Sequence, residues 1–327
     1  MNYTNTNKPP ISVIIPAFNE SGAIAEQIES VRRTLLDQDF DFEIIVVDDG
    51  SSDNTAEQAI QAQARVLSHP ENCGYGMSLK TGISAAKNEV IVIIDADGTY
   101  PAEQIPAMIE KLDHADMVVG ARTGSQVHTS WARQPAKWFL RQLAERIAEQ
   151  SIPDLNSGLR TFRKDCARQY FSILSNRFSF TTTITLAYLA DGYRVLYHPI
   201  NYYSRIGRSK IVPWHFMDFT ILIIRMSMMF NPLKVFVPLA FTFGFLGLLK
   251  MIYDVFALFA RASDAGWELL LQPVLSTSAV LLLFVGLQLM ILGMVADGVI
   301  RRIGQLNRRQ APSHGYISYE VTNRDED

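Results

Sequence analysis

Residues 11–119 alternate short apolar runs with amphipathic stretches. Five apolar runs predict β-strands, at residues 11–17, 43–47, 66–67, 89–94 and 117–119. The stretches between them predict helices, at residues 21–37, 55–64 and 78–87. Continuous rather than alternating apolar runs are typical of strands covered on both faces. This order of elements predicts an α/β domain with right-handed crossovers and a mostly parallel mixed sheet.

Large apolar side chains dominate residues 233–300. Two stretches, 235–259 and 269–295, are each long enough to cross a hydrocarbon core of about 30 Å as a helix. Two buried helices of a soluble protein would give a similar pattern, but the length and apolarity favour a transmembrane hairpin. Lys250 and Asp254 interrupt the first stretch at i, i+4 spacing, so we expect them to pair or to reach the far interface.

The segment before these spans, residues 213–230, is apolar over a broad side. His215, Asp218 and Arg225 recur at helical spacing along the other side. We therefore expect an amphipathic helix in the membrane interface, with a buried core helix as the alternative.

Basic residues predict the orientation of the hairpin. Four arginines follow the second span, namely Arg301, Arg302, Arg308 and Arg309, whereas the connector between the spans is not basic overall. The positive-inside rule therefore places both ends of the hairpin in the cytoplasm. The polar N-terminus lacks the apolar stretch of a signal peptide, so we expect the α/β domain in the cytoplasm too. The expected parts are a domain at 1–212, an interfacial helix at 213–230, two spans within 233–300 and a basic then polar tail at 301–327.

Composition excludes some classes of partner. The net charge of the 327 residues is −3, which argues against a nucleic-acid-binding protein, because such domains are usually basic. Cys73 and Cys166 lie far apart without CxxC spacing, so neither a zinc site nor a disulfide framework is indicated.

Acidic residues follow two of the predicted strands. Asp95 and Asp97 come directly after the run 89–94, and the carboxyl ends of parallel strands are where ligands bind. Two hard oxygen ligands on one turn suit Mg²⁺ or Mn²⁺ completed by diphosphate oxygens and water. Asp48 and Asp49 take the equivalent place after 43–47, where a carboxylate can bind a base or a ribose. The residues that follow are also good helix-capping material, and the two roles are compatible.

Seven motifs make a family resemblance specific. I-I-P-A-F-N-E (14–20), V-V-D-D-G-S-S-D-N-T (46–55), N-x-G-Y-G-x-S-L-K-x-G (72–82) and D-A-D-G (95–98) together resemble the nucleotide-sugar half of the family 2 inverting glycosyltransferases. V-V-G-A-R (118–122), D-L-N-S-G-L-R (154–160) and R-I-G-R-S-K-I (205–211) resemble the dolichol-phosphate mannose synthase and polyprenyl-phosphate glycosyltransferase branch. The resemblance implies a single glycosyltransferase A-type domain. It also implies metal-dependent, inverting transfer of a sugar from a nucleotide diphosphate to undecaprenyl or dolichyl phosphate.

The resemblance also implies site residues. The nucleotide sugar would be bound by Pro16, Ala17, Asn19, Glu20, Asp48 or Asp49, Lys80, Asp95 and Asp97. Of these, Asp95 and Asp97 would hold the metal, and Arg122, Arg205, Ser209 and Lys210 would hold phosphate oxygens of donor or acceptor. Dolichol-phosphate mannose synthases often have Gln two residues after the second metal Asp. Thr99 stands there in this chain, which leaves a third side-chain contact open.

Proton chemistry favours a phosphate acceptor. A sugar hydroxyl must lose a proton to attack and needs a carboxylate base, whereas a phosphomonoester is already ionised near neutral pH and needs cations. Cations are frequent after the D-x-D triplet, Arg133 and Lys137 among them, and residues 178–187 contain no carboxylate. Asp154 is the acidic candidate near the acceptor motif, either as a base or as an organiser of its loop. The expected catalytic set is Asp97, Arg122, Asp154, Arg205 and Lys210.

Two other functions fit the sequence less well. The first is a membrane glycosyltransferase that acts on a sugar hydroxyl of a lipid-linked sugar or polysaccharide. The second is an inactive scaffold that binds nucleotide at the membrane, which the intact Asp95/Asp97 pair and the cations oppose. A location in the bacterial inner membrane is expected, and self-association through the membrane helices is compatible with the sequence.

Overall fold

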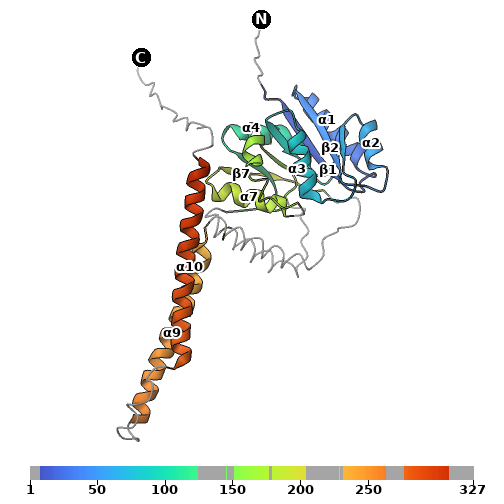
Figure 1. Ribbon diagram of the computed structural model, residues 1–327. Helices are drawn as coiled ribbons and strands as arrows, with labels where there is room; N and C mark the ends of the chain where they lie inside the picture. The colour runs from blue at the N-terminus through green and yellow to red at the C-terminus, as the bar shows by residue number, and fades with distance from the viewer. Residues whose placement is uncertain are drawn as a thin grey trace, which may run out of the picture. The chain divides into compact units, whose positions relative to one another are not determined.

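The computed structural model describes residues 8–123, 145, 151–176, 179–203, 228, 231–262 and 276–308. The chain divides into two compact units, residues 1–230 and residues 231–327. The first unit is a sheet with helices on both faces, and the second is a pair of long helices (Figure 1).

A mixed seven-stranded sheet forms the centre of the first unit, in the order β3-β2-β1-β4-β6-β5-β7. Its strands are β1 (Ile11–Ala17), β2 (Phe42–Asp48), β3 (Arg65–Ser68), β4 (Val90–Ile93), β5 (Met117–Arg122), β6 (Arg160–Arg163) and β7 (Val195–Ile200). Strand β6 is antiparallel to β4 and β5, and the other pairs are parallel. The start of β6 therefore lies at the same edge of the sheet as the ends of β4 and β5, because Arg160 pairs with Ile93 and Val119.

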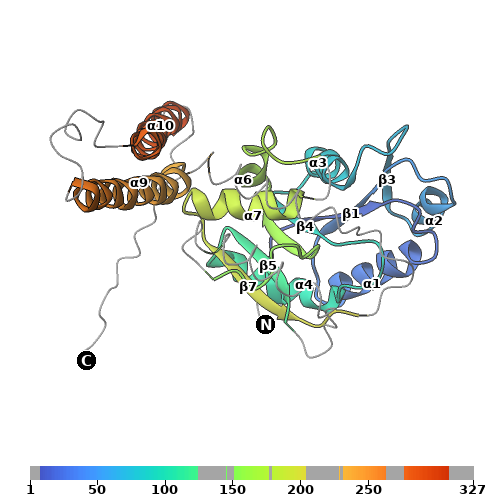
Figure 2. The same ribbon diagram turned by 90° about the horizontal axis from the view of Figure 1, so that it is seen from below.

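Helices cover both faces of this sheet (Figure 2). One face packs against α1 (Ile24–Leu36), α2 (Thr55–Gln61) and α4 (Ile105–Glu110), and the other against α3 (Tyr75–Ala85), α6 (Lys164–Arg168) and α7 (Phe180–Ala190). Successive residues of β1 alternate between the two cores: Val13 belongs to the first and Ile14 to the second. Both are fully buried, and each such side chain contributes about 1.5–3 kcal/mol. Two short 3₁₀ helices, η1 (Ala102–Gln104) and η2 (Lys111–Asp113), flank α4.

The predicted fold class is confirmed. The five predicted strands correspond to β1–β5, and the sheet is mixed with mostly parallel pairs. Helix α3 begins at Tyr75, three residues before its predicted start at Ser78. Gly74, with φ +99°, supplies the change of direction there. Strands β6 and β7 were not predicted.

The second unit consists of α9 (Leu233–Ala262) and α10 (Thr277–Arg308), which lie side by side (Figure 1). Their backbones approach closely at Gly286, where an added Cβ would lie 2.9 Å from the Ala240 carbonyl oxygen and from the Gly244 nitrogen. Small residues at such a crossing are typical of helices that pack together in a membrane.

Both helices are long and apolar enough to cross a membrane, over Leu233–Phe259 and Thr277–Ile300. Only 11% and 17% of their most apolar stretches are buried, so they do not resemble the mostly covered core helices of a soluble protein. Phe241, Phe256 and Phe259 are among the large side chains left exposed. Two long apolar helices of this kind indicate a membrane protein.

The ends of α10 differ from the prediction. The helix begins at Thr277 rather than at residue 269, and residues 263–275 lie outside the described part of the chain. It continues beyond residue 295 to Arg308, so Arg301, Arg302 and Arg308 belong to the helix and not to a separate tail. Arginine is a good helix former and is favourable near a helix C-terminus, which explains the extension. The interfacial helix predicted at 213–230 lies outside the described residues except for Met228.

Lys250 and Asp254 form the predicted ion pair within α9. The second carboxylate oxygen of Asp254 accepts hydrogen bonds from the backbone N–H of Ser276 at 3.0 Å and from its hydroxyl at 2.5 Å. The ion pair therefore also ties α9 to the residue that precedes α10.

Candidate active site

The loops after β1 and β2 are tied together into one wall at the carboxyl edge of the sheet. The side-chain oxygen of Asn19 accepts the backbone N–H of Ser52 at 2.8 Å, and the Asn19 N–H donates to the Ser51 hydroxyl at 2.9 Å. Next to it, the Glu20 N–H donates to the hydroxyl of Thr55 at 2.9 Å. Asn19 has φ +54°, a conformation that asparagine tolerates better than most residues. The predicted nucleotide residues of the first two motifs are thus brought together.

Pro16 and Ala17 are the last residues of β1, where they pair with Val47 and Asp48 of β2. All four are buried or nearly so, which places the ends of both strands beneath the loops that follow. The backbone of Pro16 and Ala17 therefore lies directly beneath the loops that Asn19 ties together.

Asp48 and Asp49 are both buried but differ in their contacts. One oxygen of Asp49 accepts the N–H of Cys73 at 3.0 Å and faces His69 Nδ1 at 2.7 Å. Its other oxygen accepts the N–H of Gly74 at 2.8 Å. Asp49 therefore fixes the turn that enters α3. Asp48 accepts one backbone N–H, that of Ser51 at 3.3 Å, and is the better placed of the two for a nucleotide contact.

Asp49, His69 and Cys73 bring metal-ligating atoms within 4.8 Å of one another. Asp49 and His69 already use those atoms in hydrogen bonds, since His69 Nε2 also lies 2.9 Å from the Thr81 hydroxyl. This cluster is therefore explained as an internal hydrogen-bonded network.

The D-x-D residues follow β4 as predicted. Asp97 is buried, and one of its oxygens accepts the Thr99 N–H at 3.2 Å and the Thr99 hydroxyl at 2.6 Å. Asp95 is partly exposed and accepts the Tyr75 hydroxyl at 2.9 Å. Its carboxylate also occupies the space that a side chain at Gly158 would take. Two carboxylates with backing hydroxyls form an oxygen-only donor set, which fits Mg²⁺ or Mn²⁺.

Arg122 and Asp154 form a two-pronged ion pair. The guanidinium donates from Nε to Oδ2 at 2.7 Å and from Nη2 to Oδ1 at 2.9 Å, and the Arg122 backbone N–H also donates to Oδ2. Burial alone would raise the pKa of Asp154, but these hydrogen bonds and the charge of Arg122 lower it below its usual value. The same pairing outweighs burial at Arg122 and raises its pKa. This geometry favours Asp154 as a loop organiser over Asp154 as a base.

Arg160, the last residue of D-L-N-S-G-L-R and one of the cations that follow the D-x-D triplet, is fully buried at the start of β6. Its guanidinium donates to the carbonyl oxygens of Ser157 and Leu155, both at 2.8 Å, and to the Thr185 hydroxyl. Burial lowers its pKa. Arg160 therefore holds the D-L-N-S-G-L-R loop against the sheet, and its place at the end of that motif was the available signal.

Tyr202 and Tyr203 are a second pair that sequence reasoning missed. The guanidinium carbon of Arg122 lies 5.3 Å from the centre of the Tyr202 ring, which also packs edge-on against Tyr100. The backbone N–H of Tyr203 donates to the Thr99 carbonyl oxygen at 3.0 Å. The chain that leaves β7 is thus fastened to the loop that carries the D-x-D residues.

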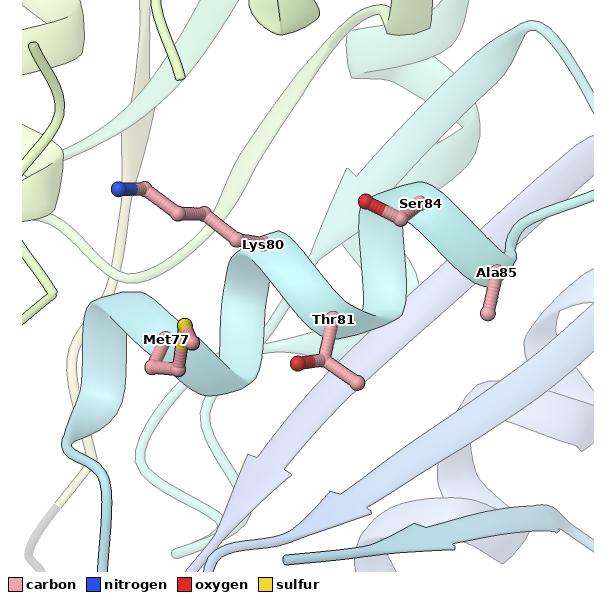
Figure 3. Close-up of a pocket in the computed structure, with 5 residues that line it drawn as sticks. All are labelled: Met77, Lys80, Thr81, Ser84 and Ala85. Carbon is pink, nitrogen blue, oxygen red and sulfur yellow. The ribbon is translucent and has the colours of Figure 1, made fainter. Parts of the chain in front are cut away.

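Lys80 does not point to the nucleotide wall. Its ammonium group donates to the Leu174 carbonyl at 2.6 Å and to the Asn176 side chain at 2.7 Å, so it fastens α3 to the loop after α6. It also borders a shallow hollow on α3, together with Met77, Thr81, Ser84 and Ala85. Figure 3 shows Lys80 and Thr81 leaving the helix in different directions. We therefore leave Lys80 out of the candidate site.

Five predicted acceptor residues lie outside the described residues: Arg133, Lys137, Arg205, Ser209 and Lys210. The last three follow Tyr203 closely in the sequence, so the chain that leads to them begins beside Thr99.

Two family models match the chain. Residues 12–171 match glycosyl transferase family 2, and residues 231–301 match the GtrB C-terminal hairpin. The first match lies within the sheet unit, and the second lies within the unit formed by α9 and α10.

Solved structures share the fold of the first unit. One is glucosyl-3-phosphoglycerate synthase from Mycobacterium tuberculosis in complex with Mn²⁺, UDP-glucose and phosphoglyceric acid, with 20% identity, a TM-score of 0.54 and coverage of 67% of this chain and 80% of that one. The same enzyme in complex with Mg²⁺ and UDP gives 20% identity, a TM-score of 0.54 and coverage of 67% and 79%. These similarities establish the glycosyltransferase A-type fold.

Proposed function

We propose that this chain, which matches glycosyl transferase family 2 over residues 12–171, transfers a sugar from a nucleoside diphosphate to a polyprenyl phosphate with inversion. The contact between Thr99 and Tyr203 carries the proposal. It joins the loop of the D-x-D residues, where the donor diphosphate would bind, to the start of the chain that leads into R-I-G-R-S-K-I. Donor and acceptor phosphates would then meet at one edge of the sheet.

The donor half uses the wall around Asn19 and the carboxylates after β2 and β4. Asp48 would bind the base or the ribose, and Asp95 and Asp97 would hold Mg²⁺ or Mn²⁺. When bound, the metal supplies positive charge to the departing diphosphate. The similar enzyme from Mycobacterium tuberculosis was crystallised with Mn²⁺ or Mg²⁺ and UDP, which supports a divalent cation here.

The acceptor half must bind an anion rather than remove a proton. An ionised phosphate oxygen forms the new bond to the anomeric carbon as the bond from that carbon to the diphosphate breaks, so no proton needs to move. Asp154 is engaged by Arg122 through both oxygens, which makes it a poor base and supports an acceptor that needs none. Arg122 itself would present its remaining N–H groups to an anion, and Arg205, Ser209 and Lys210 would contribute to binding the same phosphate.

The second unit supports a lipid acceptor. Helices α9 and α10 are apolar enough to span a membrane, and the matching hairpin model covers residues 231–301. A polyprenyl phosphate keeps its chain in the bilayer, so its phosphate must be met at the surface. We place the catalytic unit on the cytoplasmic side of the inner membrane, because nucleotide sugars are made in the cytoplasm.

The test incubates the purified full-length chain in detergent with undecaprenyl phosphate, Mn²⁺ and each of a panel of UDP- and GDP-sugars. The mass of the lipid product is then measured by mass spectrometry. We expect one hexose to be added to the phosphate lipid and none to undecaprenol, which lacks the phosphate. Transfer to a lipid-linked sugar but not to the phosphate would favour a sugar-hydroxyl acceptor. The absence of any donor turnover would favour the inactive scaffold.

A further inference from the structure

The carboxylate of Asp95 is held by residues from two distant parts of the chain. From α3, the Tyr75 hydroxyl donates to Oδ1 at 2.9 Å. From the loop before β6, Gly158 leaves open the space that the carboxylate fills. An added Cβ at Gly158 would lie 2.3 Å from Oδ2, 2.5 Å from Cγ and 2.6 Å from Oδ1.

Gly158 is itself fixed in place. Its backbone N–H donates to the hydroxyl oxygen of Tyr100 at 2.7 Å. On one side, the Ser157 hydroxyl donates to the Gly120 carbonyl, and Arg160 binds the Ser157 carbonyl oxygen. The φ angle of Gly158 is not in the left-handed region, so the backbone itself would accept alanine there. The requirement for glycine is therefore one of space beside Asp95.

Tyr75 can act only as a donor to Asp95. A phenol has an ordinary pKa of about 10, so its hydroxyl carries a proton near neutral pH, and an ionised carboxylate can only accept. The bond from Tyr75 to Oδ1 orients the carboxylate, and the missing side chain of Gly158 leaves the space in which the carboxylate lies.

We propose that Tyr75 and Gly158 are positioning residues that orient Asp95 for the divalent cation. The proposal rests on the proposed function, because it takes Asp95 as a metal ligand. Gly158 belongs to the D-L-N-S-G-L-R loop of the acceptor half. The acceptor loop would therefore complete the donor's metal site, and changes in that loop would alter metal affinity.

The primary test measures binding of Mn²⁺ by electron paramagnetic resonance, with UDP and then GDP present and no acceptor. Partners that hydrogen-bond to metal ligands typically contribute 10–100-fold to metal affinity. We therefore expect Tyr75→Phe to weaken Mn²⁺ binding by about tenfold. The matched control is Tyr170→Phe, because the buried Tyr170 donates to the Asp191 carboxylate at 2.6 Å and is not part of the site. It should bind Mn²⁺ like the wild type.

Gly158→Ala should weaken Mn²⁺ binding more than Tyr75→Phe does, because it pushes the carboxylate aside. Its control is Gly22→Ala, since a Cβ at Gly22 meets nothing within 4 Å. Thermal unfolding shows whether Gly158→Ala still folds; if it does not, Tyr75→Phe alone decides, because it removes one oxygen and changes no packing volume appreciably.

Asp95→Ala separates the two levels of the argument. Wild-type Mn²⁺ affinity in Asp95→Ala would overturn the metal assignment and this proposal with it. Loss of binding in Asp95→Ala together with wild-type affinity in Tyr75→Phe and Gly158→Ala would overturn the positioning proposal alone.

Discussion

Arg122 and Asp154 meet through two hydrogen bonds of 2.7 and 2.9 Å, from the end of β5 to the loop before β6. A third bond, from the Arg122 backbone to the same carboxylate at 3.1 Å, makes the carboxylate part of the strand end. The side chains are only 25% and 10% exposed, so the pair is largely withdrawn from water. This ion pair thereby joins the two ends of the long segment that connects β5 to β6, which are neighbouring strands.

We expect this pair to make stability depend on acid pH. The pKa of Asp154 is lowered in the folded chain, so its contribution is present above the ordinary aspartate pKa of about 3.9 and is lost as the pH falls through the folded value. Asp154→Asn leaves the Arg122 charge without its partner and should cost about 3 kcal/mol at pH 7. Thermal unfolding of the full chain in detergent would show this difference shrink below pH 4. The exposed Asp41→Asn serves as the control, and a constant difference across that range would contradict the prediction.

Asp97→Ala should abolish sugar transfer while leaving the fold intact, because it removes a metal ligand at the edge of the sheet and no core packing. Transfer is measured with the lipid-product assay, and folding by circular dichroism. The control is Asp39→Asn, which removes an exposed carboxylate far from the D-x-D residues in the sequence, at a residue whose φ of +53° asparagine accepts. Undiminished transfer by Asp97→Ala, or full activity of the wild type in EDTA, would show that Asp97 does not act through a metal.

The orientation of the helix hairpin can be tested by cysteine labelling from outside intact cells. After Cys73 and Cys166 are replaced by serine, a cysteine at Ser263 should react and one at Ser313 should not. Ser263 lies in the connector between the spans and Ser313 follows the basic end of α10, so the positive-inside rule places them on opposite sides. The reverse labelling pattern would put the catalytic unit outside the cell.

The basic motif after Tyr203 should bind the acceptor phosphate itself. With a short-chain, water-soluble polyprenyl phosphate in detergent, Arg205→Ala and Lys210→Ala should each lower the transfer rate about tenfold or more, because a hydrogen bond to a charged group contributes about 1.5–3 kcal/mol. Arg168→Ala, which removes an exposed cation from α6, should leave the rate unchanged. Attraction to anionic lipid contributes about 1 kcal/mol per basic residue and is absent in detergent. Wild-type transfer rates in both variants in detergent would contradict the prediction and leave the motif with a role in membrane attachment only.

The sequence predicted the elements whose pattern is local and failed where tertiary contacts override the pattern. Strands β1, β2 and β4 are buried on both faces, so their apolar runs stand out. Strand β6 begins with Arg160, whose charge argues against a central strand. Its burial depends on carbonyl oxygens of the preceding loop and on the Thr185 hydroxyl of α7. Strand β7 contains Pro199, which is tolerated because β7 is at the edge of the sheet.

The same limit applies to the site. The motifs located the carboxylates at the strand ends, because a strand end is a local feature. They did not show which partners each carboxylate has. Asp49 accepts hydrogen bonds from the turn before α3, and Asp154 is paired with Arg122. Nor did they indicate that Tyr75 and Gly158 converge on Asp95, since that contact joins a helix and two loops that are far apart in the sequence.

The reversed strand β6 makes the segment between β5 and β6 an insert whose two ends meet in the sheet. Residues 123–159 leave the sheet at Arg122 and return at Arg160, and Val119 pairs directly with Arg160, so the two ends of this segment are neighbours. Lengthening a loop whose ends are already joined costs little free energy. Chimeras that exchange this segment between relatives, with the Asp154 and Gly158 equivalents kept, should therefore retain the sheet and the carboxylates at its edge. Selection can therefore vary this segment without rebuilding the sheet that carries the D-x-D residues.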